Sequence, residues 1–398
     1  MSSSGPSDTH LRDYVVLLSG RLLRAFGFGF SAVLLAIYLQ WRGLTSVQIG
    51  VVLTAGVLSA SLTGLGLASL ATHLGRRTTL SMAGVLMALS GIDLALAGGF
   101  WWMVVAALTG MIGAASTDLG PFLAVEQAVL TETVPPSGRN RAFGRYSLTA
   151  ALAAAAGSLT AGLGTDLSRG RLFFLGFALI GVLTAGLPFL LSPAVEGQPE
   201  APLLRSVRPL LGLSALFALD SFGGGLVTNS LVAFWLHQRF GASAEVLGPS
   251  FAAISLVVAA SYEAAGWLGD RIGLVNTMVF THLPSNILLI LTAFSPNLVW
   301  AIAFLLARNA ISQMDIPVRQ AYVVSIVKPN ERAGALATTG AIRGVAQACG
   351  PVLTGLAIQV GALAVPFVVS GGVKIVYDLG LYRGFRRHLG DHERVKPR

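Results

Sequence analysis

A repeat relates the two halves of this chain and constrains its fold more than any other feature of the sequence. Residues 118–162 and 311–355 match at a constant offset of 193 positions. The matched pairs are Gln127 and Gln320, Pro136 and Pro329, Arg139 and Arg332, Ala142 and Ala335, Gly157 and Gly350, and Gly162 and Gly355. Because each copy reads as two apolar helices joined by a short basic loop, the repeat predicts a polytopic membrane protein whose halves have the same orientation.

The composition restricts the chain to integral membrane proteins. Hydrophobic residues make up 54% of its 398 positions and charged residues only 11%, with a mean hydropathy of +0.72. Lipid must therefore replace water over most of the surface. The one cysteine, Cys349, excludes an intramolecular disulfide and is interpreted as a small buried packing residue. The sequence has no zinc-ligand spacing, phosphate-binding loop or nucleotide fingerprint, so we expect no metal, cofactor or nucleic-acid partner.

Windows of about 20 residues divide the chain into twelve apolar stretches. They cover residues 14–39, 47–71, 78–98, 101–126, 142–164, 171–191, 209–236, 245–268, 274–295, 298–324, 335–360 and 363–383. We predict an all-α polytopic membrane protein with twelve transmembrane helices in two parallel six-helix halves. Residues 1–191 form the first half, the proline-containing segment 192–208 is a cytoplasmic linker, and residues 209–398 form the second half with a basic cytoplasmic tail.

The positions of Lys and Arg between the stretches predict the orientation. If the N-terminus is cytoplasmic, 17 of the 27 cations lie in cytoplasmic segments and four lie in outside loops. Cytoplasmic loops are enriched in Lys and Arg, so both termini are predicted to be cytoplasmic in a multi-pass protein of the cell (inner) membrane. The first stretch is predicted to be a retained helix rather than a signal peptide. Topology and contact with anionic lipid headgroups account for the net charge of +9.

The loop after the eighth stretch resembles the signature of the major facilitator superfamily. Members of this family show G-x-x-x-D-R-x-G-R-R after the second helix of a half, and GWLGDRIG supplies Gly266, Asp270, Arg271 and Gly273. The first half keeps Arg76 and Arg77 but has Thr72 and His73 where the family usually has Asp and Arg. Twelve helices in two halves is also the family layout, so the resemblance covers nearly the whole chain.

The resemblance implies a gate on the cytoplasmic side, because in this family the motif is associated with stabilising the outward-facing conformation. We expect Asp270 and Arg271 to latch this side near Arg319, with glycine allowing the close helix reversal. Arg76 and Arg77 are assigned to the corresponding, weaker gate of the first half. The alternative is that the motif only makes a well-formed turn.

A Gly-Pro pair in the eleventh stretch, Gly350 and Pro351, points to one subtype of the family. Drug antiporters of the family typically carry such a pair in the fifth helix, where this chain has Ser158 in place of proline. The resemblance therefore favours a drug/proton-antiporter-like protein. Small residues let helices approach closely and proline permits a bend, both useful where the halves rock.

Ionisable residues inside apolar stretches are costly, by about 2.5–3.5 kcal/mol at the helix centre on insertion scales, and mark functional positions. Arg24 and Asp220 lie near the middle of the first and seventh stretches, and Arg308 lies in the tenth. Helices one, four, seven and ten line the central cavity in the family, so the resemblance implies that these residues bind substrate or couple transport to protons. The alternative is a permanent Arg24–Asp220 salt bridge that holds the halves together.

Four further charged residues are assigned to the gate. A bend after Asp315 brings its carboxylate toward Arg319 or Arg343. Glu126 and Arg319 occupy repeat-equivalent positions with opposite charge, which predicts an ion pair between the halves.

Neutral side chains and one helical charge pair complete the predicted set. Lys374 and Asp378 are four residues apart on the twelfth stretch, the spacing of an intrahelical pair. Phe26, Asn229 and Gln347 are assigned to the substrate cavity, with helix packing as the alternative.

Together these features predict a secondary active transporter that moves a small organic solute by alternating access. The resemblance favours proton-coupled export by a monomer in the lipid bilayer. The alternative is an importer or facilitator of an organic anion or nutrient, supported by the arginines inside the membrane. No enzyme activity is predicted, because no His, Ser and Asp residues have the spacing of a triad and because His237 and His282 are placed near span ends.

Overall fold

The computed structural model describes residues 6–113, 121–134, 139–196, 211–315 and 332–385, together with residues 318, 319, 322, 323 and 327. This part of the chain is helical and contains no strand. Its first half holds α1 (Pro6–Trp41), α2 (Ser46–Leu74), α3 (Arg76–Leu96), α4 (Phe100–Leu108), α5 (Pro121–Thr133), α6 (Arg139–Ala161), α7 (Leu167–Gly186), and the 3-10 helices η2 (Leu187–Leu190) and η3 (Pro193–Glu196). Its second half holds α8 (Leu211–Leu226), α9 (Asn229–Phe240), α10 (Ala244–Ile272), α11 (Leu274–Ala293), α12 (Leu298–Ser312), α14 (Arg332–Ala348), α15 (Gly350–Gln359) and α16 (Val365–Phe385).

The predicted apolar stretches correspond to these helices, and three stretches are interrupted. The fourth contains α4 and α5, the seventh α8 and α9, and the eleventh α14 and α15. Thr228 is extended immediately before α9. Pro351 lies in the first turn of α15, where its missing N–H costs no helical hydrogen bond. Within the described residues, nine segments are long and apolar enough to cross a membrane by length and composition.

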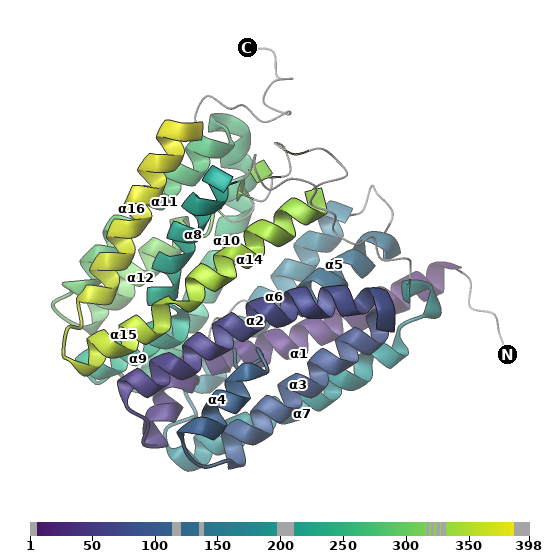
Figure 1. Cartoon of the computed structure of the whole chain (residues 1–398), viewed down its shortest axis with the longest axis horizontal. Coiled ribbons are helices and arrows are strands. Elements are labelled where there is room, and N and C mark those ends of the chain that lie inside the picture. The colour runs from purple at the N-terminus through teal and green to yellow at the C-terminus, as the bar shows by residue number, and fades with distance from the viewer. Residues whose placement is uncertain are drawn as a thin grey trace.

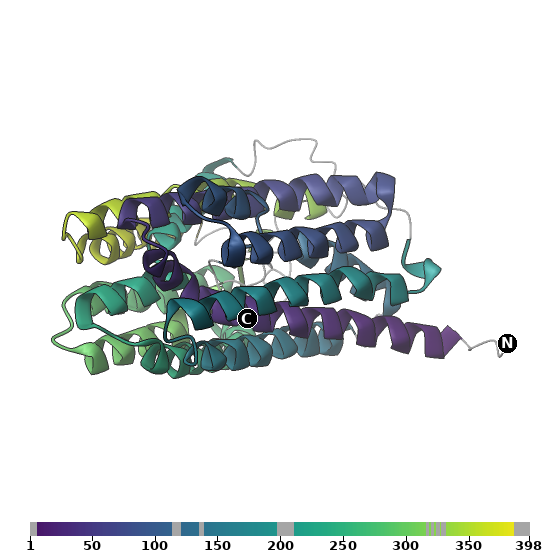
Figure 2. The same ribbon diagram turned by 90° about the horizontal axis from the view of Figure 1, so that it is seen from below.

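The helices form two bundles that meet at one end and diverge at the other. Figure 1 shows α1–α7 and α8–α16 spreading apart toward the end where α1 begins and α16 ends, and Figure 2 shows the helices packed side by side with α1 reaching past its neighbours. We call the end that carries the loops 42–45, 162–166 and 360–364 the closed end, because the halves pack together there. The opposite end is the open end.

Backbone contacts between small residues hold the closed end together. A Cβ added to Gly248 of α10 would lie 2.8 Å from the backbone nitrogen of Gly162, at the end of α6. On the other side of the molecule, Gly355 of α15 packs on the backbone of Ser46 in α2. Close approach of helix backbones inside a membrane is the usual role of such residues.

The sequence repeat has a direct structural meaning. Gly157 packs on the backbone of Phe26 in α1, and its match Gly350 packs on the backbone of Gly225 in α8. These contacts lie within each half. The next matched pair, Gly162 and Gly355, makes the contacts between the halves described above. In each copy of the repeat, the first glycine therefore contacts its own half and the second contacts the opposite half.

Helix starts at the closed end are stabilised by side chains. Thr45 and Gln48 form a capping box at the start of α2. Asp166 accepts hydrogen bonds from two backbone N–H groups at the start of α7. The bond from the Arg169 N–H lowers the pKa of the Asp166 carboxyl below its usual value, because it stabilises the charged form.

Cys349 lies at the junction of α14 and α15 and is exposed. The prediction of a buried packing residue is wrong, because the neighbouring Gly350 occupies the packing position against Gly225. The Cys349 thiol lies 3.6 Å from the carbonyl oxygen of Val345, one turn earlier in α14.

Candidate functional site

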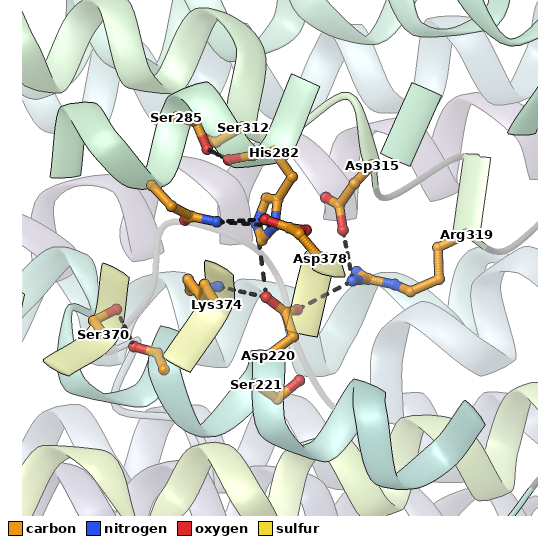
Figure 3. Close-up of polar contacts among 12 residues, drawn as sticks. Asp220, Ser221, His282, Ser285, Ser312, Asp315, Arg319, Ser370, Lys374 and Asp378 are labelled. Atoms are coloured by element: carbon orange, nitrogen blue, oxygen red, sulfur yellow. Dashed lines mark hydrogen bonds and ion pairs between the residues drawn. The ribbon is translucent and has the colours of Figure 1, made fainter. Parts of the chain in front are cut away.

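Asp220 lies at the centre of a buried polar network inside the second half, shown in Figure 3. Its Oδ1 accepts a hydrogen bond from Nζ of Lys374 at 2.6 Å. Its Oδ2 accepts one from Nη1 of Arg319 at 3.3 Å. The Asp220 side chain is 6% exposed, and burial of this kind makes each charged partner necessary to keep the carboxylate ionised.

His282 of α11 connects Asp220 to a second carboxylate. Its Nε2 lies 3.6 Å from Oδ1 of Asp220, and its Nδ1 lies 2.9 Å from Oδ1 of Asp378 in α16. Asn286, one turn further along α11, donates to the other oxygen of Asp378 at 2.9 Å. One imidazole ring therefore faces a carboxylate with each nitrogen, and the protonated ring can satisfy both.

His282 does not lie near a span end, so its predicted placement is wrong. Residue 282 lies in the interior of α11 and is 3% exposed. Counting from the start of the predicted stretch 274–295 would have included this histidine among the ionisable residues inside the membrane. The predicted Lys374–Asp378 pair is also wrong, because Lys374 bonds to Asp220 and Asp378 bonds to α11.

Arg319 joins Asp220 to Asp315 at the end of the α12 segment. Nη1 of Arg319 donates to Oδ2 of Asp315 at 2.7 Å as well as to Asp220. The predicted contact between Asp315 and Arg319 is therefore present, and the role of both residues in a gate stays a prediction.

Two other arginines approach the same network without a carboxylate partner among the described residues. Nε of Arg343 in α14 donates to the hydroxyl of Ser221, the neighbour of Asp220, at 2.9 Å. Nε of Arg308 in α12 is buried and has no hydrogen-bond acceptor there. Both guanidinium groups are within electrostatic range of Asp220 and Asp315.

The first half contains a separate ion pair. Nη2 of Arg24 donates to Oε2 of Glu126 at 2.5 Å, and the Tyr146 hydroxyl donates to the same oxygen at 2.6 Å. The Arg24 guanidinium also lies over the Phe122 ring, 4.1 Å from its centroid. Neither the alternative Arg24–Asp220 salt bridge nor the predicted Glu126–Arg319 pair forms in this structure, since Arg24 pairs with Glu126 and Arg319 pairs with Asp220 and Asp315.

Arg76 and Arg77 hold the end of the first half rather than the facing half. Oε2 of Glu196 accepts a hydrogen bond from the Arg76 backbone N–H at 2.5 Å, and Oε1 accepts one from that of Arg77 at 3.1 Å. The Arg77 side chain also donates to the carbonyl groups of Pro188 and Phe189. A carboxylate is favourable at a helix N-terminus, so this clamp fixes η2 and η3 on α3.

The motif of the second half is only partly within the described structure. Arg271 is exposed and stacks on Trp267, 4.2 Å from the ring centroid. Gly273 has a φ of 88°, which permits the tight turn between α10 and α11. The side chain of Asp270 and the surroundings of Gly266 lie outside the described part, so the latch stays a prediction.

The neutral residues assigned to the cavity lie on helices of both halves. Phe26 is half-buried and meets Phe30 edge to face, with centroids 5.9 Å apart. Asn229 is the first residue of α9, and Gln347 lies one turn after Arg343 on α14. No described group of three or more His, Cys, Asp or Glu side chains could hold a metal ion.

Two membrane-embedded helical bundles with charges buried between their helices define a transporter architecture. Comparison with known proteins identifies the family: the model of the Major Facilitator Superfamily matches residues 17–219 and 213–397. The chain belongs to this family, which indicates a transporter rather than an enzyme.

Individual relatives are distant. An uncharacterized membrane protein of Saccharomyces cerevisiae is 25% identical over 415 residues, which cover 92% of this chain and 93% of that protein. The crystal structure of the nucleoside transporter NupG has a TM-score of 0.75 at 14% identity, over 94% of this chain and 99% of that chain. The D-xylose-proton symporter has a TM-score of 0.73 at 16% identity, over 94% and 98%. These structures share the twelve-helix fold with this chain.

Proposed function

We propose that this protein is a proton-coupled secondary active transporter of a small organic solute, with export as its direction. The observation that carries the proposal is His282, held between the carboxylates of Asp220 and Asp378 in a buried site. Histidine is the side chain that most readily exchanges a proton near neutral pH. The subtype resemblance of the Gly350–Pro351 pair supports the direction.

The network offers a path from protonation to helix movement. When His282 takes up a proton, the imidazolium becomes a third cationic partner of Asp220, and the hold of this carboxylate on Lys374 and Arg319 weakens. Arg319 is then left with Asp315, and α8 is released from α16. Because α8 packs on α14 through Gly225, movement of α8 reaches a helix that also contacts α2 of the other half.

The second candidate function is import or facilitated movement of an organic anion or nutrient. It is favoured by Arg308 and Arg343, which have no carboxylate partner among the described residues. In that case the Asp220 network is a fixed structural element, and solute flux does not depend on a pH gradient.

Reconstitution into proteoliposomes separates these functions. Ethidium, benzoate and xylose represent cationic, anionic and neutral solutes, and each is tested for accumulation driven by a pH gradient and for exchange at equal pH. We expect Asp220→Asn and His282→Gln to abolish gradient-driven accumulation while exchange remains, because exchange needs no net proton movement. Arg169→Gln, an exposed change 59% open to solvent in the native side chain, serves as the matched control.

Two results contradict the proposal. Wild-type flux that ignores the gradient supports the facilitator. Full gradient-driven accumulation by Asp220→Asn removes the network from the coupling step.

A further inference from the structure

The carboxylates of the second-half network already have cations or donors of the network as partners. Asp220 is bound by Lys374 and Arg319, and Asp315 is bound by the same arginine. Asp378 is bound by His282 and Asn286 of α11. None of these three acids offers a free oxygen pair to another guanidinium.

Arg308 and Arg343 bring the permanent cations of the network to four, against its three carboxylates. Arg343 donates to a hydroxyl group, and the Nε of Arg308 has no acceptor among the described residues. A guanidinium inside a membrane protein is stabilised by an anionic partner, and without one its burial is costly. Both guanidinium groups lie close enough to Asp220 and Asp315 to interact with them electrostatically.

We propose that the missing partner is the substrate, and that its carboxylate or phosphate group binds to Arg308 and Arg343. Planar guanidinium groups bind such oxyanions through paired N–H donors, which a lysine cannot reproduce. Gln347 lies four residues after Arg343, on the same face of α14, and supplies an amide donor beside it. This inference rests on the proposed transport function and specifies its substrate class as a small organic anion.

An anionic substrate also gives the charges of the network a shared role. Asp220 is the neighbour of Ser221, the residue that holds Arg343. A proton on His282 offsets the negative charge of Asp220 beside this site and so favours an incoming anion. Proton and anion then strengthen each other's binding through one stretch of α8.

The test is a binding measurement that needs no pH gradient. The full chain, purified in detergent, is titrated with benzoate and glucose 6-phosphate, and with benzamide and glucose as neutral analogues, while thermal unfolding and calorimetry report binding. We expect the anions to bind and raise the Tm, and the neutral analogues to have no effect. Arg308→Gln and Arg343→Gln should each weaken anion binding at least tenfold, whereas Arg169→Gln binds as the wild type.

The lysine variants distinguish a loss of anion binding from a loss of folding. Arg308→Lys and Arg343→Lys keep the charge and should bind anions more weakly than wild type but better than the glutamine variants. Lysophosphatidylglycerol is titrated in parallel, and if it alone binds in an arginine-dependent manner, the oxyanion comes from a lipid and the assignment of the site to a small organic substrate is overturned. Equal binding of neutral analogues, no anion binding, or unchanged affinity in both glutamine variants overturns the proposal. If anion binding depends on the arginines but solute flux does not depend on the pH gradient, proton coupling is refuted and the anion site is supported.

Discussion

At the scale of single residues, the buried charges fall into two groups with different consequences. Arg24 and Glu126 are 2% and 3% exposed and neutralise each other within the first half. The second-half network instead contains shared carboxylates and a histidine that can change charge. We therefore propose that Arg24 serves stability and that the Asp220 network serves function.

Removing one partner of the Arg24 pair should destabilise the protein strongly. Glu126→Gln leaves a buried guanidinium without its counter-ion, and loss of one member of a buried pair costs about 3–5 kcal/mol. We expect a markedly lower Tm for Glu126→Gln and for Arg24→Gln in detergent-solubilised protein.

The double variant Arg24→Gln/Glu126→Gln is the decisive comparison. Because it leaves no uncompensated charge, it should lose less stability than the sum of the two single changes. Additive losses would show that the two side chains act independently.

The sequence identified charged residues inside the membrane but assigned several wrong partners. Asp220 was correctly placed within a helix, yet its partner Lys374 is 154 residues away on the last helix. Helical periodicity defines which residues share one face of one helix, and it carries no information about which distant helix that face meets. For the same reason the spacing of Lys374 and Asp378 predicted a pair that does not form.

At the scale of helices, the closed end depends on backbone contacts that tolerate no side chain. Gly248 meets the end of α6, and Gly355 meets the start of α2. Hydropathy predicted these helices well, since a long apolar segment in a membrane has few alternatives to a helix. It did not predict the interruption at Thr228, because averaging over about 20 residues conceals a break of one or two.

A larger side chain at Gly248 should separate the halves at the closed end. Overpacking a tight contact costs about 1–3 kcal/mol, which disfavours the state in which α6 and α10 touch. Spin labels at Arg169→Cys and Ser243→Cys, in a Cys349→Ala background, report the distance across this end.

We expect Gly248→Val to lengthen the distance between the two labels. Gly176→Val on α7 is the matched control, because a Cβ at Gly176 meets nothing within 4 Å. If both variants give the wild-type distance, the contact does not determine closure.

At the scale of the whole molecule, the distribution of charge predicts the orientation in the membrane. The α2–α3 and α10–α11 turns, which carry Arg76, Arg77 and Arg271, lie at the open end, and the loops with few cations lie at the closed end. The open end is therefore predicted to be the cytoplasmic one.

Labelling of intact cells tests this orientation. In the Cys349→Ala background, we expect a membrane-impermeant maleimide to label Arg169→Cys at the closed end but not His73→Cys, which is exposed beside the α2–α3 turn. Permeabilised cells should show labelling of both positions. Labelling of His73→Cys alone in intact cells would reverse the orientation.

The glycine contacts of the closed end also bear on how fast the protein can work. Large interlocking side chains would have to leave their rotamers and be rehydrated one by one before the halves could part. Where backbones meet at Gly162, Gly248 and Gly355, few side chains have to change rotamer before the helices separate. The same repeated segment makes the contact on both sides of the molecule, so the two seams can part in one step with a low activation barrier.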